Sequence, residues 1–168
     1  MNRRWLTMLL VLLAWPLQAT TVKRMDLDGL VATADTIVVG TVESSRTYWD
    51  PEGRLILKRN TIRVSESLKG QSSSTVDVTT IGGTLDGITL YVAGMPGFTA
   101  GEDTVVFLEG TGLYRTLVGL GQGKFSVEGD VVSNDISNLE FVGERPGETI
   151  RMTLDSFRDE IRQRVSPF

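Results

Sequence analysis

The chain of 168 residues contains no cysteine and no histidine. Without cysteine it can form no disulfide, perform no thiol redox chemistry and carry no thiol-linked lipid. Without histidine it lacks the commonest general base and the commonest transition-metal ligand. We therefore expect no metal, no cofactor and no catalytic residues, and we expect stability to come from packing and hydrogen bonds.

Basic residues are outnumbered as well. Lys and Arg total 17 against 21 Asp and Glu, which gives a net charge of −4. A polyanion is repelled by such a chain, and no basic stripe offsets the repulsion. We expect no nucleic-acid partner.

The first residues have the pattern of a secretion signal. Arg3 and Arg4 precede an apolar run over residues 5–17, and the small residue Ala19 follows it. The run is shorter than the roughly 20 apolar residues of a membrane-spanning helix, so we predict cleavage after residue 19 and no stable membrane span. The alternative is an uncleaved N-terminal anchor, since Leu17 is bulky for its place before the cleavage site. Cleavage predicts an exported protein, periplasmic or extracellular, with one domain over residues 20–168.

The remaining pattern is typical of a mainly β domain with a helix near each end. Apolar residues recur at helical spacing after Asp26 and again from Leu154 to Val165, where Thr153 is the predicted cap. Between them, β-branched and alternating segments predict strands, with turns at Asp50–Gly53 and Glu128–Asp130. The strands are expected at residues 36–42, 55–68, 75–79, 104–108, 114–118, 125–128 and from 131. The natural closure is a small antiparallel OB-like barrel with a short N-terminal helix and a C-terminal amphipathic helix packed on it.

Several segments are similar to the netrin-like module, the OB-type barrel of tissue inhibitors of metalloproteinases. Residues 34–40 (ADTIVVG) resemble its first strand, and residues 62–70, ending in Leu68-Lys69-Gly70, resemble its second. Residues 101–108 (GEDTVVFL) resemble a later strand that follows a glycine and a charged pair, and the terminal helix occupies a comparable place. The resemblance covers about residues 26–165 and implies an OB-type barrel fold.

The chain departs from those inhibitors at its N-terminus. Their mature chains are similar to one another in an N-terminal cysteine whose amine and carbonyl hold the zinc of the protease. The mature chain here is expected to begin Thr20-Thr21-Val22. The resemblance therefore bears on the fold more than on inhibition by that mechanism.

A glycine-rich segment at residues 119–124 has some features of a phosphate loop. Gly119, Gly121 and Gly123 precede Lys124, but Phe125 stands where that motif needs Ser or Thr, and strands are expected on both sides. We predict a sharply bent barrel corner here and no phosphate site.

The longest segment between strands runs from Ile81 to Ala100 and contains five glycines. Long loops in compact domains are often functional, and Met95, Pro96 and Phe98 are candidates for an apolar partner-binding tip. In the alternative, Tyr91, Val92 and Phe98 fold back and cover the open end of the barrel.

Two aromatic residues, Tyr48 and Trp49, precede the turn at Asp50 and are further candidates for partner contact. Packing across neighbouring strands is the alternative for both rings.

These observations predict an exported, non-catalytic domain that binds a protein partner through the 81–100 loop and the turn near Tyr48, with an exported protease as one conceivable partner. A carboxylate-dependent hydrolase of envelope polysaccharide and a structural accessory domain are the alternatives. No pair of acids can be placed from the sequence, because the neighbours Glu102 and Asp103 would face opposite sides of a strand.

Overall fold

The computed structural model describes residues 21–71, 73–142 and 149–165. Strands dominate this part of the chain, and helices α2 (Leu27–Thr33) and α3 (Leu154–Val165) flank them in sequence. The predicted secretion signal lies outside the described residues. None of the helices in the described ranges is long and apolar enough to cross a membrane.

Two long antiparallel strands form the main hairpin, β2 (Thr36–Trp49) and β3 (Ile56–Lys69). Asp50 closes the turn between them, because its carboxylate accepts from the backbone N–H groups of Arg54 and Leu55 at 2.6 and 2.8 Å. These bonds, first the one from Leu55, hold the pKa of Asp50 below its usual value. Strand β2 is longer than predicted, because its pairing with β3 continues to Trp49 and Ile56 at the tip, whereas β3 lies within one residue of its predicted bounds.

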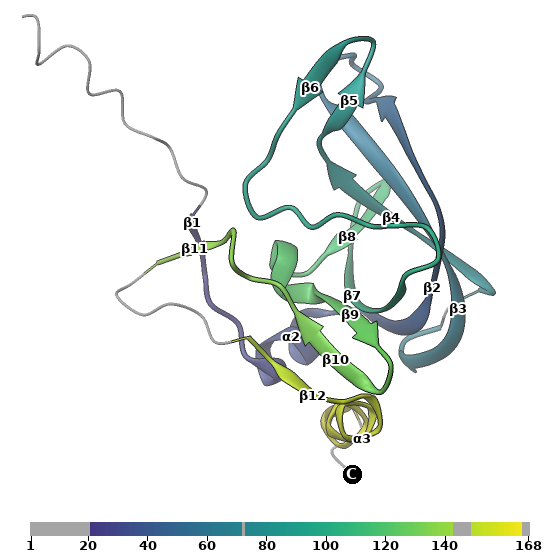
Figure 1. The fold of residues 1–168 in the computed structure, drawn as a ribbon, viewed down its shortest axis with the longest axis vertical. Coiled ribbons are helices and arrows are strands. Elements are labelled where there is room, and N and C mark those ends of the chain that lie inside the picture. The colour runs from purple at the N-terminus through teal and green to yellow at the C-terminus, as the bar shows by residue number, and fades with distance from the viewer. Residues whose placement is uncertain (1–20, 72, 143–148, 166–168) are drawn as a thin grey trace, which may run out of the picture.

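The main sheet has the order β12-β10-β9-β7-β2-β3-β4, and β8 also pairs with β7 (Figure 1). Its remaining strands are β4 (Thr75–Ile81), β7 (Asp103–Thr111), β8 (Tyr114–Leu117), β9 (Lys124–Glu128), β10 (Val131–Asn134) and β12 (Arg151–Thr153). Two small sheets are separate from it: β1 (Thr21–Val22) with β11 (Glu140–Phe141), and β5 (Gly83–Leu85) with β6 (Ile88–Leu90).

The expected closed barrel is not confirmed, because the main sheet is not closed. Strands β4 and β8 come within 8 Å of each other between Cα atoms, but they are not hydrogen-bonded neighbours. The mainly β class with two helices is confirmed. Each of these two strands is hydrogen-bonded on one side only, β4 to β3 and β8 to β7.

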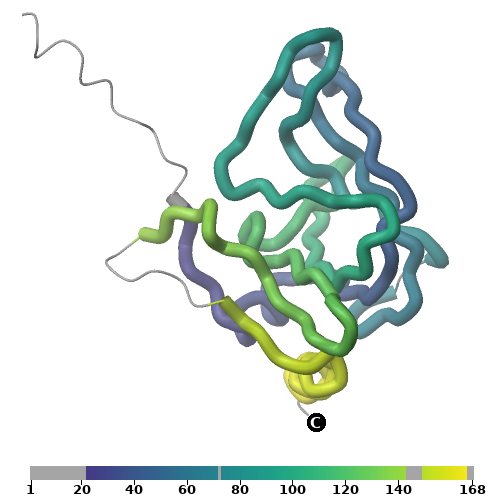
Figure 2. Tube along the Cα trace, viewed as in Figure 1, coloured from purple at the N-terminus to yellow at the C-terminus, as the bar shows by residue number. Residues whose placement is uncertain are grey.

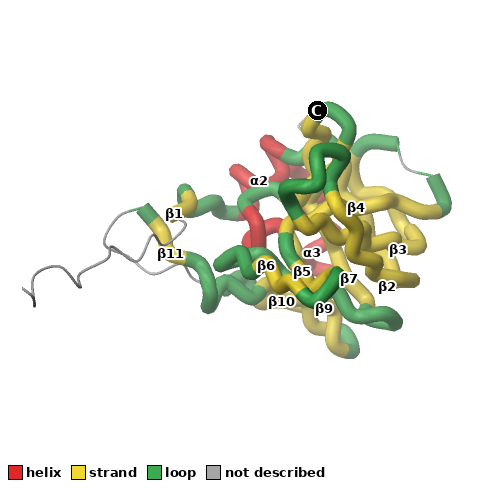
Figure 3. Tube along the Cα trace, turned by 90° about the horizontal axis from the view of Figure 1, so that it is seen from above, coloured by secondary structure: helices red, strands yellow, loops and turns green. Residues whose placement is uncertain are grey.

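Two apolar clusters fill the domain. In the first, α2 and α3 cover one side of the strands, and Phe107, Phe125 and Phe157 pack with ring centroids 4.7 to 6.0 Å apart. In the second, apolar residues of β2, β3, β4, β7 and β8 surround Phe98. Figure 1 shows both helices in the lower half of the molecule and the β5–β6 hairpin at its top, and in the view from above α2 lies between the β1–β11 pair and the long strands (Figure 3).

Both predicted helices are confirmed, and so is the predicted cap Thr153, whereas Asp26 was expected in the first turn of its helix and is its N-cap. Asp26 accepts from the backbone N–H of Gly29 at 2.8 Å, and Thr153 accepts from that of Ser156 at 3.3 Å. On α3, Phe157 and Ile161 are fully buried in the first cluster. The helix is also tied to β3, since Arg158 and Arg162 contact the carboxylate of Glu66 at 2.9 and 2.5 Å.

Candidate functional site

The segment predicted as one long loop at residues 81–100 contains the β5–β6 hairpin. Its turn residues Asp86 and Gly87 have φ angles of 51° and 76°, which suits a two-residue hairpin turn. Beyond β6 the chain runs back across the molecule, as Figure 2 shows. Only residues 91–100 are therefore irregular.

This hairpin is joined to the tip of β2, where the sequence placed two candidate residues. Trp49 Nε1 donates to Asp86 Oδ2 at 2.8 Å, and Thr47 Oγ1 donates to the carbonyl of Thr84 at 3.3 Å. Tyr48 lies under the guanidinium of Arg59, 5.4 Å from its ring centre. Trp49 thus holds the hairpin in place, and both rings are half-buried.

The other three candidate residues, Met95, Pro96 and Phe98, do not share one environment in the structure. Phe98 is 8% exposed and belongs to the second apolar cluster, so its ring is not offered to a partner. Met95 and Pro96 are half-buried and line two hollows on the surface. The expectation that Phe98 covers the strands agrees with this placement, whereas Tyr91 is 76% exposed and does not fold back.

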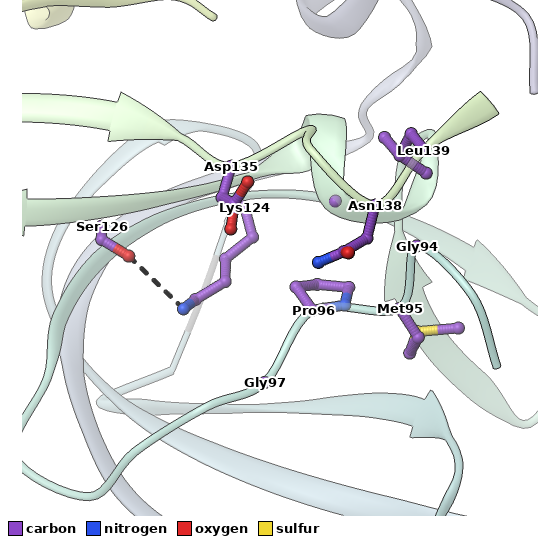
Figure 4. Close-up of a pocket in the computed structure, with 10 residues that line it drawn as sticks. Gly94, Met95, Pro96, Gly97, Lys124, Ser126, Asp135, Asn138 and Leu139 are labelled. Atoms are coloured by element: carbon purple, nitrogen blue, oxygen red, sulfur yellow. Dashed lines mark hydrogen bonds between the residues drawn. The ribbon is translucent and has the colours of Figure 1, made fainter. Parts of the chain in front are cut away.

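The first hollow is a cleft of about 220 Å³ between residues 94–97, β9 and the 135–139 segment. Figure 4 shows Lys124 and Ser126 on the β9 side, with Pro96 and Asn138 across from them. Gly94 adopts a φ of 75° at its rim, and a Cβ there would overlap with Leu139, so glycine is needed at this position.

Lys124, which lines this cleft, forms a partly buried ion pair with Glu102. Lys124 Nζ donates to Glu102 Oε1 at 2.5 Å, the Ser126 hydroxyl donates to the same oxygen at 2.7 Å, and the Thr99 N–H donates to Oε2 at 3.1 Å. The side chains of Lys124 and Glu102 are 11% and 19% exposed. Burial raises the pKa of Glu102, but the bonds from Lys124, Ser126 and Thr99 outweigh it, so the net pKa lies below the ordinary value.

Asp135, which lines the cleft, is also held in its ionised form. The hydroxyl and the backbone N–H of Ser137 lower the pKa of Asp135 below its usual value. A glycosidase needs one carboxylic acid that is protonated near neutral pH, and neither Glu102 nor Asp135 meets that condition. Ser126 lies 3.5 Å from Lys124, but the Ser126 hydroxyl and the Lys124 amine both donate to Glu102 Oε1, so the two are not arranged as a nucleophile and its base. The cleft therefore does not show a hydrolytic arrangement.

The segment with some features of a phosphate loop is structural. Residues 120–123 form the 3-10 helix η2 (Leu120–Gly123) between β8 and β9, which agrees with a bent connection between strands. Gln122 is buried and hydrogen-bonds to the N-terminal segment. Its Oε1 accepts from the Met25 N–H at 2.8 Å, and its Nε2 donates to the Lys23 carbonyl at 3.1 Å. Within the described residues, no three acidic side chains gather in a way that could hold a metal ion.

The second hollow was not predicted and has a mixed lining. It measures about 150 Å³; Lys58 and Thr80 are polar lining residues, while Ile81, Leu90, Tyr91, Met95 and Pro96 supply apolar surface. Ile88 lies two residues from Leu90 on β6, so the two side chains share a face, and Ile88 is 55% exposed. We call this region the hairpin surface. It comprises Ile81, Ile88, Leu90, Tyr91, Met95 and Pro96.

Comparison with protein-family models and with curated proteins gives no match to this chain.

Proposed function

We propose that this domain is a non-catalytic binding module that takes a protein partner on the hairpin surface. The observation that carries the proposal is the exposure of Tyr91 and Ile88, at 76% and 55%, on a hairpin that hydrogen bonds hold in place. Neighbouring exposed apolar side chains are a common mark of an interaction site.

Rigidity supports this proposal. Binding to a mobile loop costs the entropy of ordering it, whereas a surface that is already ordered avoids most of that cost. The Trp49–Asp86 hydrogen bond and the Thr47–Thr84 hydrogen bond fix the hairpin to the long β2–β3 hairpin. Trp49 thus serves the site by positioning, while Tyr and Met side chains of the kind present here are enriched at protein interfaces.

The export prediction and the fold resemblance suggest the setting. If residues 1–19 direct secretion, the partner is an exported or envelope protein, and an exported protease is the partner class that the netrin-like resemblance suggests. We also propose that the scaffold is an OB-type barrel that closes when β4 pairs with β8. The strand order β4-β3-β2-β7-β8 supports this proposal, because the first and last strands of this series come within 8 Å of each other between Cα atoms. Slow hydrogen exchange at the seam-facing amides of β4 would indicate closure in solution, and fast exchange there would contradict it.

Site-specific photo-crosslinking tests the binding site. A photoreactive residue placed at Tyr91 in the mature domain should capture one defined envelope protein. The same residue at Leu113, which is 90% exposed on the separate β7–β8 hairpin, is the matched control and should not capture it.

The captured protein is then purified and its affinity measured. Ile88→Ser and Tyr91→Ser should each weaken binding by about tenfold or more, as central apolar contacts do, and Leu113→Ser should change it less than about twofold. Identical capture from positions 91 and 113, or unchanged affinity in both hairpin variants, would reject the hairpin surface as the binding site.

A further inference from the structure

A further cleft lies where β3 and β4 face the turn between β7 and β8. We call it the seam cleft. Its volume is about 390 Å³, within the range of small-molecule sites, and it is separate from the hairpin surface. Strands β3 and β4 and the β7–β8 turn line it, with Tyr48, Arg59, Asp77, Thr79, Gly110, Gly112, Leu113, Tyr114 and Arg115.

Two guanidinium groups in the seam cleft are weakly engaged. Arg115 is half-buried and has no acidic partner in the part of the chain that the structure describes. Arg59 faces Asp77 at 3.7 Å, beyond hydrogen-bond length, and both side chains are more than half exposed. An exposed pair of this kind contributes little, so Arg59 is available to another anion.

The cleft is positive in a negative protein. Arg59 and Arg115 outnumber the single acid Asp77 in its lining, whereas the whole chain has a net charge of −4. A local positive site that persists in an acidic domain favours an anionic ligand. A guanidinium presents paired N–H donors whose spacing matches a planar carboxylate.

The rest of the lining favours a small polar ligand with a ring. Tyr114 is a half-buried aromatic residue of the lining, the Tyr48 ring lies under the Arg59 guanidinium, and Gly110 and Gly112 add no side chains. A partner strand does not fit between β4 and β8, because their Cα atoms lie within 8 Å and an inserted strand needs about 4.8 Å on each side.

We infer that the seam cleft binds an acidic sugar, whose carboxylate pairs with Arg115 and Arg59 and whose ring packs against Tyr114. The lining lacks the two carboxylates that hydrolysis of a glycoside needs, since Asp77 is the single one among its residues. The inference does not depend on the protein partner, because none of the cleft residues belongs to the hairpin surface.

Titration of the mature domain with a short oligogalacturonate tests this inference, with calorimetry and amide NMR shifts as readouts. We expect a dissociation constant of roughly millimolar order or tighter, with shifts centred on Tyr114 and Arg115, and no binding of the neutral galactose oligomer. Arg115→Gln should weaken binding by about tenfold, because a charge-assisted hydrogen-bonded pair is lost.

Arg63→Gln is the matched control. Arg63 is on the same strand as Arg59 and faces Glu43 at the same 3.7 Å, but it does not line the seam cleft. It should change the affinity less than about twofold. Equal losses in both variants would show a nonspecific charge effect and overturn the site.

Three other results would also overturn the inference. They are the absence of oligogalacturonate binding, equal binding of the neutral oligomer, and tighter binding of a glutamate-rich peptide or of inorganic phosphate. Tyr91 does not line the seam cleft, so the Tyr91→Ser variant should still bind the sugar while it loses the protein partner. The two proposals can therefore be rejected independently of each other.

Discussion

The Glu102–Lys124 pair should be strongly coupled to the stability of the fold. Glu102→Gln removes the carboxylate that faces Lys124, whose side chain is only 11% exposed. A fully buried charge that loses its partner costs about 3–5 kcal/mol. Lys124 keeps the Ser126 hydroxyl at 3.5 Å and the face of Phe98 at 5.1 Å, so we expect a smaller loss of about 2 kcal/mol.

A double-mutant cycle measures the coupling directly. Lys124→Met leaves Glu102 with the hydrogen bonds from Ser126 and Thr99 and should also cost about 2 kcal/mol. The double variant should be less destabilised than the sum of the two single variants, by about 1–3 kcal/mol. Urea unfolding at neutral pH supplies all four free energies of unfolding.

The pH dependence of stability is an independent test of the Glu102–Lys124 pair. The folded pKa of Glu102 lies below its ordinary value of 4.5, so its stabilisation is complete above that value and is lost as the pH falls through the folded pKa. Glu102→Gln should therefore flatten the loss of stability in acid. The exposed pair Arg54 and Glu52 is the control and should show almost no coupling. Additive effects at Glu102 and Lys124, within about 0.5 kcal/mol, would refute the reasoning.

Three further substitutions test the packing, each by its free energy of unfolding in urea. Tyr48→Phe should stabilise the domain by about 1 kcal/mol, because the Tyr48 hydroxyl is buried and has no hydrogen-bond partner among the described residues; destabilisation would show that the hydroxyl is bonded in solution. Gly94→Ala should cost about 1–3 kcal/mol, because a side chain is strained at a φ of 75° and would also overlap with Leu139. Gly87→Ala is its control: Gly87 has a similar φ of 76° but no atom near its missing Cβ, so this variant measures the backbone strain without the overlap. Phe157→Ala should cost about 3–5 kcal/mol, and a loss below about 1 kcal/mol would mean that α3 does not pack as described.

Local patterns predicted much of the fold. Thr153 caps α3 as expected, Asp26 lies at the start of α2, and the Glu128–Asp130 turn joins β9 and β10. These features depend on neighbours within a few residues, so the sequence shows them directly. The β5–β6 hairpin was also readable, since Asp86-Gly87 between Leu85 and Ile88 is a strong hairpin signal, but the surrounding glycines made the segment look irregular.

Contacts between distant residues were not predictable. Glu102 meets Lys124 and Ser126 across 22 and 24 residues, and no spacing rule connects them. The closed barrel was expected because closure removes sheet edges, but whether β4 pairs with β8 depends on the twist and bulges of β2 and β3. The register shifts in that hairpin are set by packing on both faces, which a single sequence does not display.

The segment after β6 combines two roles, and this decides how its function must be tested. Phe98 is buried in the second apolar cluster, while Tyr91, Met95 and Pro96 face the hairpin surface only a few residues away. Deleting residues 95–98 would remove a core aromatic side chain along with the surface, and a large core truncation costs several kcal/mol. Loss of binding after such a deletion would be expected whether or not the surface takes part. Substitutions at Tyr91 and Ile88 avoid the ambiguity, because both side chains are exposed and their removal leaves the cluster around Phe98 in place.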